Sequence, residues 1–148
     1  MTDELSQAEA DALLAIAKRA LSNAPVRFPD PGNKISVELQ SWNEKERFLL
    51  DVNRSYVSLS KITYQTRGRV VIILARLDID GPPHRNPDDT EVGGSHLHLY
   101  REGYADKWAF AVPMEQFRDI SKRWETFEDF MKYCGVSEPP QFDRSLFS

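Results

Sequence analysis

The sequence predicts a single α+β domain with an N-terminal helix, an antiparallel sheet of five or six strands, and C-terminal helices packed on one face. At 148 residues the chain is long enough for one domain with a core of ordinary size. Its 41% apolar and 28% charged residues are typical of a globular protein. The segments between the predicted strands are too short for helical crossovers, so the strands should pair antiparallel. We expect this domain to span 1–136 and an extended tail to follow at 137–148.

The first predicted element is an amphipathic helix over residues 6–22. Ser6 and Glu9 fit a capping box, in which the serine side chain accepts from the backbone N–H of Glu9 and the glutamate side chain accepts from the backbone N–H of Ser6. Apolar residues recur at helical spacing along two neighbouring lines, Leu13, Ile16 and Ala20, and Leu14, Ala17 and Leu21. The prolines of residues 25–33 then predict a loop, because proline lacks an N–H donor.

Alternation of apolar and polar residues predicts the strands that follow. They are residues 35–40, 48–52, 61–67, 70–79, 95–100 and 108–112. The strand at 70–79 begins apolar on both sides, as a central strand does. Towards its end, one side changes to Arg76, Asp78 and Asp80.

Two helices are predicted after the last strand. Pro113 could begin the first, because proline is favoured in the first turn, and Phe117, Ile120 and Trp124 recur at helical spacing. Thr126 is the expected cap of a second, short helix that ends at Gly135.

Charge, cysteine content and apolar runs indicate which kinds of partner and which cellular compartment to expect. A net charge of -4 gives no general attraction for nucleic acid or an anionic membrane, so RNA binding would need a local basic patch. The single cysteine, Cys134, allows no intrachain disulfide and is expected to be a buried, inert thiol. The acidic N-terminus is unlike a secretory signal, and the longest apolar run, Val70 to Ala75, is too short to span a membrane. We expect a cytoplasmic protein that does not associate with membranes.

The candidate site is the stretch that contains every histidine of the chain, His84, His96 and His98. Histidine changes its charge near neutral pH and is a common metal ligand. If the strands on either side of the 81–94 loop form a hairpin in which Asp78 faces His96, then Arg76 faces His98, and all four project from one face. A shift of one residue would turn the neighbouring leucines to solvent.

Three functions remain open for this cluster. The first, which we favour slightly, is metal-free phosphodiester cleavage by an endoribonuclease-like enzyme, with histidines as base and acid and an arginine to stabilise the charge on phosphorus. Its catalytic residues would be His84, His96, His98, Arg76, Arg85 and Asp78. RNA bases would stack on the aromatic residues Tyr100, Tyr104 and Trp108.

The second function is metal binding, since His-x-His on a strand places two imidazoles on one side. Its ligands to a divalent metal ion such as zinc, manganese or iron would be His84, His96, His98 and Asp88. The third is a non-catalytic binding or regulatory module, in which the cluster is solvated and an Arg76–Asp78 ion pair contributes about 0–1 kcal/mol. The first function needs no cofactor and implies RNA or a small phosphate ligand as partner. A protein partner, or a homodimer formed through an edge strand, also remains open.

Most of the chain resembles a known family. The resemblance rests on two runs, Arg76-Leu-Asp-Ile-Asp-Gly-Pro-Pro-His-Arg-Asn-Pro-Asp88 and His96-Leu-His-Leu-Tyr-Arg-Glu-Gly-Tyr-Ala-Asp-Lys-Trp-Ala109. They are similar to a family of small bacterial proteins known only as a domain of unknown function, and the likeness extends from the N-terminal helix to the aromatic C-terminal helix. It implies a bacterial cytosolic protein and brings no activity with it. More loosely, a His-x-His strand in a small α+β domain is similar to some bacterial toxin ribonucleases.

Overall fold

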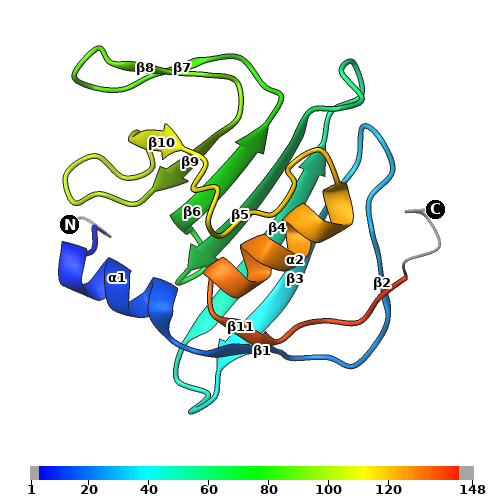
Figure 1. Cartoon of the computed structure of the whole chain (residues 1–148). Coiled ribbons are helices and arrows are strands. Elements are labelled where there is room, and N and C mark those ends of the chain that lie inside the picture. The colour runs from blue at the N-terminus through cyan, green and yellow to red at the C-terminus, as the bar shows by residue number, and fades with distance from the viewer. Residues whose placement is uncertain (1–3, 144–148) are drawn as a thin grey trace.

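The computed structural model describes residues 4–143 and confirms a single-domain α+β fold (Figure 1). The helices are α1 (Gln7–Ala15) and α2 (Arg123–Tyr133). The main sheet contains β1 (Lys18–Ala20), β3 (Lys34–Ser41), β4 (Arg47–Arg54), β5 (Ile62–Gly68), β6 (Ile72–Ile79), β9 (His96–Leu99), β10 (Ala109–Ala111) and β11 (Val136–Glu138). Two short pairs complete the fold, β2 (Val26–Arg27) with β12 (Phe142–Asp143) and β7 (His84–Arg85) with β8 (Glu91–Val92).

The main sheet has eight strands in the order β10-β9-β6-β5-β4-β3-β1-β11, more than the five or six expected. Its neighbouring strands are antiparallel, as predicted, except for β1 and β11, which are parallel. The added strands are short, at three residues each for β1 and β11, and lie at one edge. Segments of this length carry too few residues to show a period of two.

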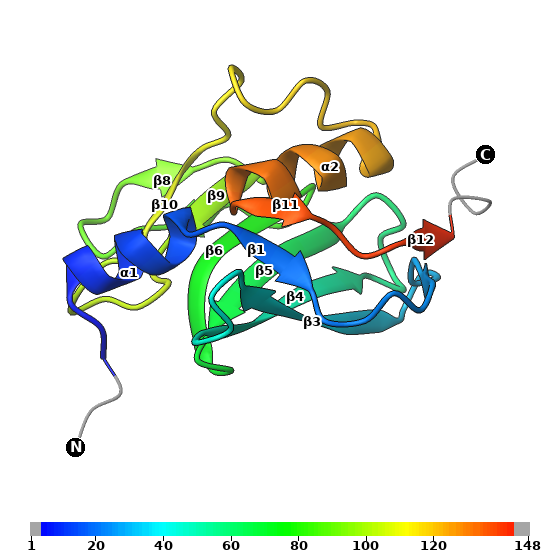
Figure 2. The ribbon, with the colours of Figure 1, turned by 90° about the horizontal axis from the view of Figure 1, so that it is seen from below.

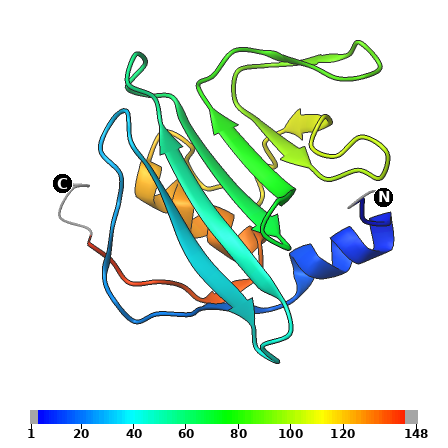
Figure 3. The same cartoon turned by 180° about the vertical axis from the view of Figure 1, so that it is seen from behind.

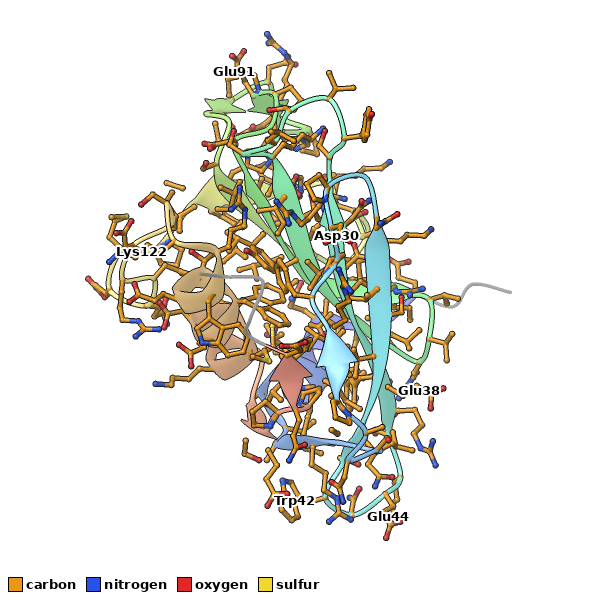
Figure 4. All side chains as sticks on the ribbon, turned by 90° about the vertical axis from the view of Figure 1, so that its right-hand side faces the viewer. Asp30, Glu38, Trp42, Glu44, Glu91 and Lys122 are labelled. Carbon is orange, nitrogen blue, oxygen red and sulfur yellow. The ribbon has the colours of Figure 1, made fainter. Side chains whose placement is uncertain are left out.

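One face of the sheet forms the core. Val52, Tyr64, Leu77 and Leu97 face one another across β4, β5, β6 and β9, and all are buried. Both helices lie on this side, as the edge-on views show (Figures 2 and 4). The opposite face carries no helix (Figure 3). We call it the open face, and it carries Arg76 and Asp78 of β6 and their partners His98 and His96 of β9.

The C-terminal helices were predicted as two, but the structure has only α2 in this region. The helix predicted from Pro113 is wrong, because residues 113–122 form turns. Thr126 is not a cap: it lies inside α2, where its hydroxyl donates to the carbonyl of Lys122, the actual N-cap residue. Arg118 folds the preceding turns back onto the helix by pairing with the buried Asp129 at 3.0 Å.

The N-terminal helix ends at Ala15, so the prediction of helix up to residue 22 is wrong. The capping box at its start is present. Lys18 explains the early end: its fully buried ammonium group donates to the carbonyls of Leu14, Ile16 and Cys134, at 2.9, 2.9 and 2.7 Å. Because these carbonyls belong to the ends of both helices, Lys18 satisfies groups that a continuing helix would use itself. Burial lowers the pKa of Lys18 to about 8.

The C-terminal segment is extended but is not a free tail as far as it is described. Val136–Glu138 extends the sheet as β11, and Phe142 pairs with Val26 through β12. The Phe142 ring lies 5.0 Å from that of Phe127 in α2. Residues 144–148 of the predicted tail lie outside the described residues. The turn into β11 needs Gly135, which has a φ of 77° and sits so close to α1 that a Cβ would lie 2.8 Å from the carbonyl oxygen of Ile16.

The strand predicted from Val70 begins at Ile72 instead, and its expected burial on both sides at Val70 and Val71 is wrong. Val70 and Val71 are 52% and 65% exposed. They belong to a tight turn in which Arg69 and Val70 both have positive φ. Their apolar character therefore does not reflect burial.

Cys134 is fully buried, and burial raises the pKa of its thiol to about 12, in agreement with an inert cysteine. Within residues 4–143, neither helix has the length and apolar character needed to cross a membrane.

Candidate functional site

The predicted hairpin register at the histidine strand is confirmed. Asp78 of β6 faces His96 of β9, and Arg76 faces His98. All four project onto the open face, since the alternating Leu77 and Leu97 are in the core. The period-two pattern of both strands therefore places two imidazoles, a carboxylate and a guanidinium side by side.

The two histidines of β9 are almost completely buried, at 3% exposure for His96 and 1% for His98. Each ring is held by its Nδ1 atom, which lies 2.6 Å from the Gly93 carbonyl oxygen in His96 and 2.8 Å from the Asp106 carbonyl oxygen in His98. A carbonyl oxygen can only accept, so each Nδ1 carries the proton and donates it. The Nε2 atoms are left for the interior of the cluster.

Both Nε2 atoms converge on Asp78. Its Oδ2 atom lies 3.1 Å from Nε2 of His96 and 3.3 Å from Nε2 of His98. These three residues form a group whose ligand atoms all lie within 4.8 Å of one another. The carboxylate that completes the group is thus Asp78 rather than Asp88, the residue expected from sequence.

One of the two contacts of the His96 ring is unfavourable when the ring is neutral. Both of its ring nitrogens face oxygen acceptors, Gly93 on one side and Asp78 on the other. A neutral ring has only one N–H donor, so its second nitrogen would place a lone pair against the carboxylate. A cation bound to this nitrogen and to Asp78 together would make the contact favourable.

Arg76 is the cation that borders this point. Its Nη2 atom lies 2.9 Å from Nε2 of His98 and 3.4 Å from Oδ2 of Asp78, and its Nη1 atom donates to Asp106 at 2.8 Å. Asp106 was missed from sequence, because it comes from the turn before β10 and not from a strand with a readable period. Its position depends on that turn, in which Arg101 and Ala105 form an isolated bridge and Ala105 has positive φ.

Asp78 is ionised over the ordinary pH range. Burial by itself would raise the pKa of this carboxyl, but the contact with the His98 imidazole, the charge of Arg76 and the hydroxyl of Thr63 outweigh burial and lower its pKa to about 2. The cluster therefore presents a permanent negative charge next to two imidazole nitrogens.

The third histidine also reaches the cluster. The His84 ring lies 4.6 Å from that of His98 and 5.6 Å from that of His96. Its Nε2 atom lies 2.7 Å from the Lys107 carbonyl oxygen and so donates to it. The loop that carries His84 is closed at its base by Gly81 and Gly94, which approach so closely that a Cβ on Gly94 would overlap the Gly81 carbonyl.

Asn86 fixes this loop and was also missed from sequence. Its buried side-chain amide accepts from the N–H of Ala109 at 2.8 Å and donates to the carbonyl of Ala109 at 3.0 Å. The amide thus makes the two backbone hydrogen bonds that a further strand would make at the edge of β10. The Asn-Pro pair in the sequence indicated only a turn.

Two of the predicted site residues are not part of the cluster. Arg85 is exposed and pairs with Glu91 across the β7–β8 hairpin, at the end of the molecule marked by Glu91 in Figure 4. Asp88 is exposed, and its carboxylate accepts from the backbone and side chain of Thr90. Hydrogen bonds from Thr90 lower the pKa of Asp88.

The three aromatic residues expected to stack on RNA bases do not form one surface. Tyr100 is buried, and its hydroxyl is bonded to the backbone of Leu5 beneath α1. Tyr104 and Trp108 do meet, edge to face, at 5.9 Å. The guanidinium of Arg101 already lies over the Trp108 ring at 4.5 Å.

Comparison with known proteins places this constellation in a family. A family model described as a family of unknown function, DUF6978, matches residues 5–136. The chain belongs to DUF6978. The match spans both helices, the His-x-His strand and most of the main sheet, so the expected membership in a family of unknown function is confirmed. No curated protein and no solved structure matches the chain.

Proposed function

We propose that this DUF6978 protein binds a divalent transition metal ion through Asp78, His96 and His98. One observation carries the proposal: both imidazoles donate Nδ1–H to a backbone carbonyl and turn Nε2 towards the same carboxylate oxygen. Histidines that bind metals usually donate their other ring N–H in this way, which fixes the tautomer and directs the lone pair.

The spacing of the donors supports the proposal. Two donors that each lie about 2.1 Å from a tetrahedral ion are about 3.4 Å apart. Oδ2 of Asp78 lies 3.1 and 3.3 Å from the two Nε2 atoms, close to this spacing, and all three ligand atoms lie within 4.8 Å of one another. An ion would also resolve the contact between the second nitrogen of His96 and the carboxylate. Two nitrogens and one carboxylate oxygen suit zinc, iron and neighbouring ions better than magnesium or calcium.

The metal-free endoribonuclease hypothesis has less support from this geometry. General acids and bases need to reach the substrate proton within hydrogen-bond distance. His96 and His98 are 3% and 1% exposed, and all four of their ring nitrogens have partners within the protein. Arg85, one of the two cations considered for the phosphate, pairs with Glu91 instead.

Metal analysis of the untagged protein tests the proposal. After incubation with zinc and removal of free ions, we expect about one equivalent in the wild type. Asp78→Asn and His96→Gln, which keep the side-chain volume, should lose most of it because each removes one donor. Asp30→Asn, on an exposed carboxylate paired with Arg27, is the matched control.

The outcomes separate the hypotheses. Wild-type protein without bound metal, or a cluster variant that keeps its full equivalent while circular dichroism shows a native fold, would overturn the proposal. The same preparations are then incubated with RNA. Cleavage that Asp78→Asn and His96→Gln abolish in the absence of metal would favour the endoribonuclease.

A further inference from the structure

The metal site has fewer protein donors than an ion requires. Among the described residues, Asp78, His96 and His98 offer ligand atoms that lie within 4.8 Å of one another, and the nearby His84 is not part of this group. Zinc and similar ions take at least four donors, and sites with three protein ligands leave a position for water or substrate. An ion bound here would therefore have at least one position for an external ligand.

The charge around that position favours an anion. The carboxylates of Asp78 and Asp106 balance a divalent ion, and the guanidinium of Arg76 then leaves the cluster with one excess positive charge. Nη2 of Arg76 lies 2.9 Å from Nε2 of His98. An ion bound to Nε2 of His98 would therefore displace the Arg76 guanidinium from this nitrogen. The displaced N–H groups would remain beside the ion, held by the pairing of Nη1 with Asp106.

The exposed side of the cluster is the side that carries Arg76. Arg76, Asp78 and Asp106 are 26%, 18% and 28% exposed in their side chains, whereas both histidines of β9 are buried below them. These three residues face the open side of the sheet, which no helix covers (Figure 3). A ligand that approaches the ion therefore meets the Arg76 guanidinium as it enters.

We infer that this site takes an oxyanion, a carboxylate or a phosphate group, bound jointly by the metal ion and Arg76. This inference rests on the proposed metal site and adds the chemical class of its ligand. Planar guanidinium forks match the geometry of carboxylate and phosphate oxygens and bind them with charge-assisted hydrogen bonds. A metal ion accepts the same oxygens as ligands, so one small anion satisfies both cations at once.

The test uses full-length protein loaded with Co²⁺, whose visible absorption changes with its coordination. Inorganic phosphate and acetate are titrated in separate arms into the wild type, Arg76→Gln and the control Arg27→Gln. We expect saturable spectral changes in the wild type and in Arg27→Gln. In Arg76→Gln, saturated with Co²⁺ before the titration, we expect the anion to bind at least about tenfold more weakly.

The results distinguish the two proposals. If the wild type binds no Co²⁺, the metal site itself is refuted. If Co²⁺ binds but neither anion changes the spectrum, or if Arg76→Gln binds the anions as tightly as the wild type, the metal site stands and the oxyanion inference fails. The tighter of the two arms identifies phosphate or carboxylate as the preferred group.

Discussion

At the scale of single residues, alternation along β9 decides which side chains can form a site. Leu97 and Leu99 pack on the core side, so His96 and His98 must face the other way, and this much was readable from sequence. The carboxylate was harder to assign. Asp78 and Asp88 lie at similar distances along the chain from His84, and only the strand pairing selects Asp78.

A second charged cluster on the open face shows the same principle and gives a stability prediction. The buried Asp51 accepts from Arg67 at 2.7 and 3.0 Å, from Gln65 at 2.8 Å and from Ser36 at 2.5 Å. Burial by itself would raise the pKa of Asp51, but these hydrogen bonds and the Arg67 charge outweigh it and lower the pKa. We expect Asp51→Asn to reduce the free energy of unfolding near neutral pH by about 2 kcal/mol.

The pH dependence of this effect follows from its sign. Because the folded-state pKa of Asp51 is below the unfolded value of about 3.9, the ionised carboxylate stabilises the fold above that value. This contribution is lost as the pH falls below about 4. Urea unfolding between about pH 6 and pH 3 should therefore show a steeper loss of stability in the wild type than in Asp51→Asn. Parallel curves for the two proteins would contradict the assignment, and the exposed Asp30→Asn should follow the wild type.

At the scale of elements, the ends of helices were the least predictable feature. The apolar lines that indicated helix up to residue 22 continue into β1, where Ala20 pairs with Leu39 as a strand residue. The reason lies far along the chain: Lys18 bonds Cys134, and β1 pairs with β11. Contacts between residues more than a hundred positions apart override local periodicity and leave no trace in a short window of sequence.

A substitution at Gly135 tests the close contact between the C-terminal ends of the two helices. We expect Gly135→Ala to lower the free energy of unfolding by about 2 kcal/mol, because a side chain disfavours a φ of 77° and its Cβ would lie 2.8 Å from the Ile16 carbonyl. Gly93→Ala is the control, since a Cβ there meets no atom within 4 Å. Chemical denaturation of the two variants measures the difference. Equal stabilities would show that the turn can relax without cost.

At the scale of the whole molecule, the sheet determines which surfaces are available. The helices cover the core face, and the open face carries the residues of the proposed metal site and the Asp51 cluster. At the β10 edge, Asn86 occupies the N–H and carbonyl of Ala109, so part of this edge is already paired. The expected homodimer through an edge strand remains a prediction, and this edge offers it fewer free backbone groups.

Metal binding should stabilise the whole fold. An ion that binds only the folded state at about 100 times its dissociation constant adds about 2.7 kcal/mol to the free energy of unfolding. For a domain of this size we expect Tm to rise by roughly 5 °C or more. Differential scanning calorimetry with and without zinc measures the shift. Asp78→Asn should show none, and an equal shift in that variant would place the stabilising ion elsewhere.

The sequence by itself determined the α+β class, the antiparallel strands and the register that pairs Asp78 with His96. Each of these follows from hydrophobic alternation, a local property that burial enforces residue by residue. Only the tertiary structure decided the rest: the end of α1, the eight-stranded extent of the sheet, the arrival of Asp106 at the cluster, and the pairing of Asn86 with the β10 edge. These features depend on turns and on contacts between distant segments, whose free energies are set by packing and by the pairing of buried polar groups.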